Sequence, residues 1–193
     1  MVHADETSWH SDGVGHHVWF AGNENLAFFH IDRHRSAEVA KTIFGENFAG
    51  TLVRDRYAAY NGIGVDWQAC IAHIITKAKE ISGEHVLLPQ TEKDPATGSF
   101  CNRVRDLCSR LCNAGQKLKS GDIPWKAAAR IEKRSVAELN NICKQSLRFK
   151  PVETVWAFLT GLEQRFLFTF LRRLGVPSTN NLVEQSLRHL VIF

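Results

Sequence analysis

The sequence predicts a mixed α/β fold, with three antiparallel strands followed by parallel strands, flanking helices and a helical insertion. Short β-favouring runs separated by turn residues fill the first 31 positions. Another short β-favouring run, Thr51–Val53, follows Gly50 between helical patterns, which is typical of a strand buried inside such a sheet; we expect this central strand over 51–54. With 193 residues, 44% of them hydrophobic, the chain can bury one core and a helical subdomain besides.

The first three strands are expected over residues 2–9, 17–21 and 26–31. Turn sequences rich in Gly, Asn and Asp separate them, so neighbouring strands should pair as an antiparallel meander. Ser36 is suited to begin a helix that Gly45 ends, immediately before the central strand.

A fifth strand is expected over 68–71, running into a helix over 72–81. This element order is that of a ribonuclease H-like fold: three strands, a helix and a strand, then a further strand and helices. We therefore expect a ribonuclease H-like mixed sheet, interrupted by a helical insertion before the last acidic residue discussed below.

The second half of the chain reads as helical and basic. Residues 84–150 hold 13 Lys/Arg against 7 Asp/Glu, and their apolar residues recur at helical spacing. We interpret this segment as an insertion, with 1–83 as the first part of the core and 151–193 as core helices that carry the last acid. Within the insertion, Ser135 should cap a helix that follows one over 124–133.

Two further expectations concern the connections of this half. Residues 83–98, which include two prolines and two glycines, read as a linker. An apolar stripe predicts one long helix over 152–174, ended by Gly175 and Pro177. Asn180 or Asn181 should then begin the last helix.

Composition argues against several classes of protein. No run approaches the ~20 apolar residues of a membrane span, and the N-terminus lacks a signal-peptide pattern. The five cysteines are not spaced as a disulfide framework, which favours a reduced, cytosolic protein. Residues 1–100 carry a net charge of −5 and residues 101–193 one of +9. An acidic half joined to a basic half suits a metal-assisted enzyme that acts on a polyanion.

Three acidic residues are candidates for chemistry. Asp5 closes the short run Val2–Asp5, Asp55 comes where the strand Thr51–Arg54 should stop, and Glu184 lies in the last predicted helix. Taken singly, each has a structural explanation: Asp55 as a turn residue paired with Arg56, Asp5 as a polar residue near a terminus, and Glu184 as the N3 residue of a capping box begun by Asn181. Taken together, they can hold two Mg²⁺ ions, because hard cations prefer oxygen ligands. Two ions ~4 Å apart support in-line displacement at phosphorus.

Four sequence blocks, in this order along nearly the whole chain, resemble the insertion-sequence-66 transposases: Ala4–Thr7, Gly50–Tyr60, Gln68–His73 and Pro177–Arg188. These are bacterial DDE enzymes with a ribonuclease H-like catalytic domain. The resemblance maps the family's catalytic and metal-binding triad onto Asp5, Asp55 and Glu184. It implies Mg²⁺, with Mn²⁺ as a substitute, and DNA strand cleavage followed by strand transfer.

The resemblance also implies partners and a place in the cell. Transposon ends and target DNA would be the partners, with a homo-oligomer in the synaptic complex and no membrane. The protein would work in the bacterial cytoplasm, at the nucleoid when bound to DNA. Relatives have upstream recognition regions and a basic continuation, so we expect this chain to be a fragment truncated at both ends.

Alternatives stay open at this point. The chain could be a nuclease of the same fold that only hydrolyses, or an inactive fragment that binds DNA or dimerises. Candidate DNA-binding residues are Tyr57, Arg103, Arg110, Lys117 and Arg188. Four residues could in principle bind zinc: Cys70, His73, Cys108 and Cys112. Because Cys108 and Cys112 fall on the apolar side of a helix, buried thiols are favoured and zinc is not expected.

Overall fold

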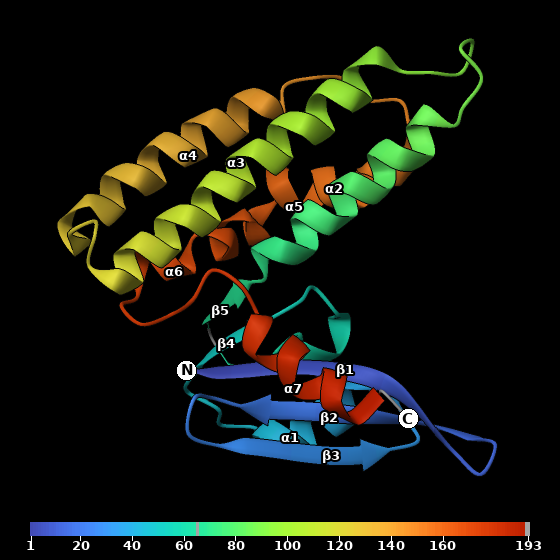
Figure 1. Cartoon of the computed structure of the whole chain (residues 1–193), viewed down its shortest axis with the longest axis vertical. Helices are drawn as coiled ribbons and strands as arrows, with labels where there is room; N and C mark the ends of the chain where they lie inside the picture. Colours follow the sequence, from blue (N-terminus) through green and yellow to red (C-terminus); the bar gives the residue numbers. More distant parts are fainter. Residues whose placement is uncertain (65, 192–193) are drawn as a thin grey trace. The chain divides into compact units, whose positions relative to one another are not determined.

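The computed structural model describes residues 1–64 and 66–191, except for the side chains of Glu184 and residues 188–191 (Figure 1). The chain divides into two compact units. The α/β unit comprises Met1–Cys70 and Thr179–Phe193, and the helical unit comprises Ile71–Ser178. The predicted division into 1–83, 84–150 and 151–193 stays a prediction, and its boundaries fall inside these units rather than between them.

A five-stranded mixed sheet forms the centre of the α/β unit. Its strands lie in the order β3-β2-β1-β4-β5. The first three are antiparallel neighbours, whereas β1 pairs parallel with β4, and β4 parallel with β5. This confirms the predicted mixed sheet. The bounds are β1 (Val2–Ser11), β2 (Val14–Gly22), β3 (Ala27–Asp32), β4 (Thr51–Arg54) and β5 (Asp66–Ala69).

Helices cover both faces of this sheet, with α7 (Asn181–Val191) on one and α1 (Ala37–Phe44) on the other (Figure 1). Val183 and Leu187, one turn apart in α7, pack against Val18 and Phe20 of β2. Ser36 occupies the N-cap position of α1, as expected, but its side chain makes no capping hydrogen bond. Gly45 ends that helix with a φ of 72°, a left-handed value that favours glycine.

The helical unit is built from α2 (Ile71–Val86), α3 (Pro95–Ser120), α4 (Ala128–Ile142), α5 (Glu153–Thr160) and α6 (Thr169–Arg172). Short 3-10 helices lie between them: η2 (Trp125–Ala127), η3 (Lys150–Val152) and η4 (Leu162–Leu167), while η1 (Ala58–Tyr60) lies in the α/β unit. No helix in the described part of the chain is long and apolar enough to cross a membrane.

The structure corrects the predicted linker over 83–98. Helix α2 continues through Gly83 to Val86, and α3 begins at Pro95, so the connection is shorter than predicted. Asp94 caps α3, accepting hydrogen bonds from the Ala96 amide at 3.1 Å and from the Thr97 hydroxyl at 3.1 Å. Glycine inside a helix costs only about 1 kcal/mol, which the packing of α2 against α3 offsets.

Two helix predictions were also wrong in detail. Ser135 does not cap a helix but is buried inside the continuous helix α4. The long helix expected over 152–174 is interrupted at Gly161, where the backbone becomes extended. The Gly161 amide donates to the Ala157 carbonyl at 2.9 Å. A Cβ at position 161 would lie 2.8 Å from that same oxygen, so the close approach requires glycine.

Candidate functional site

Asp5 lies on β1, and Asp55 directly follows β4, the parallel neighbour of β1. The predicted position of Asp5 at the end of a strand is wrong, because β1 continues to Ser11. Val2 pairs with Leu52 and His3 with Val53, an offset of 50 in both pairs. The same offset brings Asp5, inside β1, level with Asp55, the first residue after β4. Neighbouring strands are about 4.8 Å apart. The negative charges of both residues also raise the pKa of Tyr60, after the larger effects of burial and of Glu6. The two aspartates therefore share one region at the carboxyl end of β4.

The side chain of Asp5 lies on the sheet face that α7 covers. Asp5 is directly opposite Phe20 in the antiparallel pair of β1 with β2, and such residues point to the same face. Phe20 in turn packs against α7. Glu6, the next residue, is opposite Trp19 and points to the other face. The side chains of these two adjacent acids therefore point to opposite faces of the sheet.

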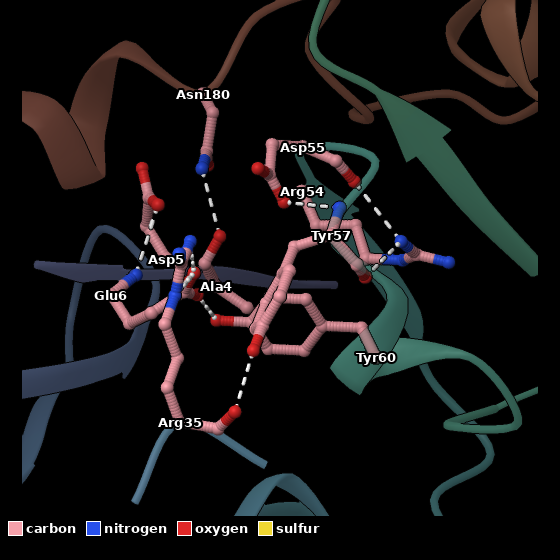
Figure 2. Close-up of polar contacts among 9 residues, drawn as sticks. All are labelled: Ala4, Asp5, Glu6, Arg35, Arg54, Asp55, Tyr57, Tyr60 and Asn180. Carbon is pink, nitrogen blue, oxygen red and sulfur yellow. Dashed lines mark hydrogen bonds and ion pairs between the residues drawn. The ribbon is translucent and has the colours of Figure 1, made fainter. Parts of the chain in front are cut away.

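The turn that carries Asp55 is held by a buried arginine. Nη1 of Arg54 donates to the carbonyl oxygens of Asp55 at 3.0 Å and Tyr57 at 3.3 Å, and Nη2 donates to Oδ1 of Asn61 at 3.2 Å. The Arg54 guanidinium stacks 3.8 Å from the ring centroid of Trp67. Oδ1 of Asp55 accepts the Tyr57 amide at 2.8 Å (Figure 2). Asp55 is therefore a turn residue as well as a candidate ligand, and both functions are compatible.

On the opposite face, Glu6 is buried and fully engaged. Its Oε1 accepts Nε of Arg35 at 2.9 Å and Nη2 at 2.5 Å, and its Oε2 accepts the hydroxyl of Tyr60 (Figure 2). Burial raises the pKa of Glu6, and the Asp55 charge adds to this, while the Tyr60 and Arg35 donors oppose it. Burial and Glu6 together raise the pKa of Tyr60, so its hydroxyl remains a donor.

Asn180, directly before α7, connects that helix to two strands. Its Oδ1 accepts from Nδ1 of His3 at 2.7 Å, and its Nδ2 donates to the carbonyl of Ala4 at 2.9 Å. Its backbone amide donates to Sγ of Cys70 at 3.2 Å. Asn180 therefore does not use its side chain to cap α7. Since α7 begins at Asn181, Glu184 is its fourth residue, which disfavours the capping-box explanation.

The third predicted ligand is only partly described. The backbone of Glu184 lies in α7, four residues after Asn180, but its side chain is outside the described residues. Among the residues that the structure describes, no three His, Cys, Asp or Glu side chains gather as a metal site. The triad of Asp5, Asp55 and Glu184 stays a prediction, of which two members are brought together.

The other predicted residues are placed as follows. Tyr57 donates its hydroxyl to the carbonyl of Arg35 at 2.6 Å. Arg110 of α3 pairs with Glu138 of α4 at 2.5 Å, Lys117 is exposed and Arg103 is half-buried. The side chain of Arg188 is outside the described residues. Cys108 is buried and Cys112 half-buried in α3, and burial raises the pKa of both thiols. Cys70 accepts from Asn180, and the expectation about zinc stays a prediction.

Sequence reasoning missed the residues that support the two aspartates. Glu6 and Arg54 lie within blocks that resemble the family but were given no role, Arg35 lies outside those blocks, and Asn180 was expected only to begin a helix. The adjacency of Glu6 to Asp5 was a signal, because alternation along a strand sends one of two neighbouring acids to the far face. Arg35, which lies between β3 and α1, gives no comparable sign.

Comparison with known families gives a match along the whole chain. The model of the Transposase IS66 family matches residues 1–193. No curated protein and no solved structure matches the chain. The match includes every segment described above: both aspartates, the strands that carry them, the helical unit and α7. The chain therefore belongs to the Transposase IS66 family.

Proposed function

We propose that this chain is the catalytic domain of a DDE transposase, in which Asp5, Asp55 and Glu184 form the acidic triad. Transposases cleave DNA and transfer the cut strands, so DNA is the substrate of this family. The observation that carries the proposal is the parallel register of β1 with β4, whose offset of 50, extended by two residues, brings Asp5 level with Asp55. The strand order, with three antiparallel strands followed by two parallel ones, supports a ribonuclease H-like core.

The third member of the proposed triad depends on α7. This helix packs on β1 and β2, and Asn180 connects its first turn to Ala4, the residue before Asp5. Glu184 follows one turn later in the same helix. Asn180 thus limits how far the backbone at position 184 can move relative to β1. We assign Glu184 to the triad on this backbone position and on family membership.

The donor set fits a hard divalent cation. Asp5 and Asp55 contribute carboxylate oxygens, the ligands that Mg²⁺ prefers, and both side chains are half-buried rather than fully solvated. The Tyr57 amide occupies one oxygen of Asp55 and so orients the carboxylate. When bound, Mg²⁺ or Mn²⁺ supplies positive charge that stabilises the charge developing on the phosphate during in-line displacement. In this proposal the residues of the chain hold the metal and orient its ligands, and none acts as a covalent nucleophile.

The helical unit supplies a basic surface for DNA. It contains 18 Lys/Arg and 10 Asp/Glu. In this proposal Arg103, Arg110 and Lys117 of α3 contact the phosphate backbone, which positions DNA without reading its sequence. The proposal includes a homo-oligomer that holds two transposon ends, and action at the nucleoid in the bacterial cytoplasm.

Asp55→Asn tests the proposal. We expect Mg²⁺ or Mn²⁺ to raise the melting temperature of the wild-type chain, because a ligand that binds only the folded state stabilises it. Asp55→Asn should abolish this rise and any Mg²⁺-dependent nicking of plasmid DNA. The metal-free melting temperature should stay the same or increase slightly, since the substitution relieves repulsion among clustered carboxylates.

Asp12→Asn is the matched control. Asp12 is exposed in the β1–β2 turn with a φ of 51°, a conformation that asparagine adopts readily. It should leave the metal response intact. A metal response that survives in Asp55→Asn would overturn the proposed site.

Joining of a pre-cut 3′-hydroxyl end to plasmid DNA separates a transposase from a nuclease that only hydrolyses. DNA binding equal with and without Mg²⁺, with no cleavage, would indicate a binding module.

A further inference from the structure

Glu6 forms the start of a continuous set of contacts that leads to Asp55. Its side chain is only 1% exposed, yet it carries a carboxylate beside Asp5 in the sequence. A buried carboxylate requires donors, and here Arg35 serves one oxygen and Tyr60 the other. Arg35 comes from the connection between β3 and α1, far from Glu6 along the chain. Glu6 therefore fixes the position of Arg35 against β1.

Arg35 holds Tyr57 at two points. The carbon atom of its guanidinium lies 4.0 Å from the centroid of the Tyr57 ring, a cation–π contact. Its carbonyl oxygen accepts the Tyr57 hydroxyl at 2.6 Å. The ring of Tyr57 also meets that of Tyr60 edge to face, with centroids 6.2 Å apart. With both its ring and its hydroxyl engaged, Tyr57 has little freedom to rotate.

Tyr57 completes the connection through its backbone. Its amide donates to Oδ1 of Asp55 at 2.8 Å (Figure 2). The amide direction depends on where the Tyr57 side chain is held, because the residue lies in a short turn between β4 and the 3-10 helix η1. The contacts thus run from Glu6 to Arg35, from Arg35 to Tyr57, and from Tyr57 to the Asp55 carboxylate.

We propose that Arg35 and Tyr57 are positioning residues for Asp55, with Glu6 holding Arg35 in place and Tyr60 holding Glu6. None of the four needs to touch metal or DNA for this role. The inference rests on the proposed function, because positioning matters for chemistry only if Asp55 is a ligand. It also gives Tyr57 a function other than the DNA contact considered from the sequence. Partners that orient metal-binding carboxylates by hydrogen bonding commonly change metal affinity when they are removed.

Tyr57→Phe is the sharpest test, because it keeps the ring under Arg35 and removes only the hydroxyl. We expect the Mn²⁺ concentration that gives half of the maximal melting-temperature rise to increase about tenfold or more. Hydrogen exchange at residues 54–61 in the metal-free protein should become faster. Arg35→Met, which removes the guanidinium, should show both effects more strongly if it folds. Arg33→Gln is the matched control, an exposed arginine two residues away that should change neither measurement.

The outcomes separate this inference from the proposed function. If wild type shows no metal response, the proposed function fails, and exchange at residues 54–61 still decides whether Tyr57 holds the turn. If wild type responds and Tyr57→Phe matches it in both measurements, the positioning role is wrong while the proposed function stands. A lower metal-free melting temperature with unchanged Mn²⁺ dependence would make the contacts merely structural, and would also overturn the inference.

Discussion

The two units of this chain carry opposite net charges. The α/β unit holds 6 Lys/Arg and 10 Asp/Glu, and the helical unit holds 18 and 10. Among the side chains that the structure describes, one carboxylate is buried in each unit: Glu6 in the α/β unit and Asp94 in the helical unit. Burial raises the pKa of Glu6 in the first, whereas in the second the Arg148 amide, followed by Ala96 and Thr97, lowers the pKa of Asp94. The comparison teaches that the balance between burial and donors decides the direction. Burial outweighs the donors at Glu6, whereas at Asp94 the donors outweigh burial, although one of them, the Arg148 amide, is 54 residues away.

The largest expected effect comes from comparing two ion pairs with the same N···O distance of 2.5 Å. The pair of Arg35 with Glu6 includes a side chain only 1% exposed, whereas Arg110 and Glu138 are 56% and 45% exposed. Arg35 itself is 45% exposed, but its removal leaves the buried Glu6 carboxylate without its charged donor, so Arg35→Met should lower the free energy of unfolding by about 3 kcal/mol. Arg110→Met should cost less than about 1 kcal/mol. Equal losses in urea titrations would contradict the comparison.

The next effect concerns the attachment of α7. Asn180→Ala removes the hydrogen bonds to His3 and Ala4, and we expect a decrease of about 2 kcal/mol in the free energy of unfolding. Hydrogen exchange in α7 should rise more than exchange in α3. Asn181→Ala, at the exposed neighbouring position, is the control and should cost a few tenths of a kcal/mol at most. If both substitutions cost the same, the interactions of Asn180 do not hold the helix.

A smaller effect tests the helical unit through Asp94. Asp94→Ala should cost about 1 kcal/mol near neutral pH, the usual cost of losing an N-cap. The lowered pKa means that the folded state gives up its proton more readily than the unfolded state. The stabilisation is therefore complete above the ordinary value of 3.8 and disappears as pH falls through the lower folded pKa. Asp94→Asn should show a shallower loss of stability in that acidic range. A slope equal to that of wild type would assign the pH dependence to other groups.

The smallest effect expected of a single substitution is on DNA binding. Removing a single interaction with a phosphate should reduce the slope of log affinity against log salt by about 0.9 for duplex DNA. Lys117→Gln should produce such a reduction for any DNA sequence. Arg33→Gln, in the acidic unit, should not. Identical salt slopes for the two variants would place the DNA surface elsewhere or give α3 a purely structural role.

The sequence was informative where structure depends on neighbouring residues. The strand Thr51–Arg54 lies where its β-favouring residues predicted, and Gly45 ends α1, because both signals are local. The break at Gly161 was missed, since the apolar stripe continues across it and only the close approach of the Ala157 carbonyl oxygen explains the glycine. The site followed the same rule. Asp5 and Asp55 were singled out because each closes a short β-favouring run, although Asp5 lies inside β1, and their role as ligands stays a prediction. Arg35 and Asn180 act on residues 29 and 177 positions away, which no local pattern reveals.

The attachment of α7 also sets an order in time during synthesis. The sheet face formed by Val18 and Phe20 is covered by Val183 and Leu187, which are translated only after the entire helical unit. Roughly one hundred residues at about 5–20 residues per second take on the order of 5–20 s. During that interval the nascent sheet exposes an apolar face. Closing so long a loop carries only a slowly growing entropic cost. The helical unit can therefore fold first, and docking of α7 completes the α/β unit last.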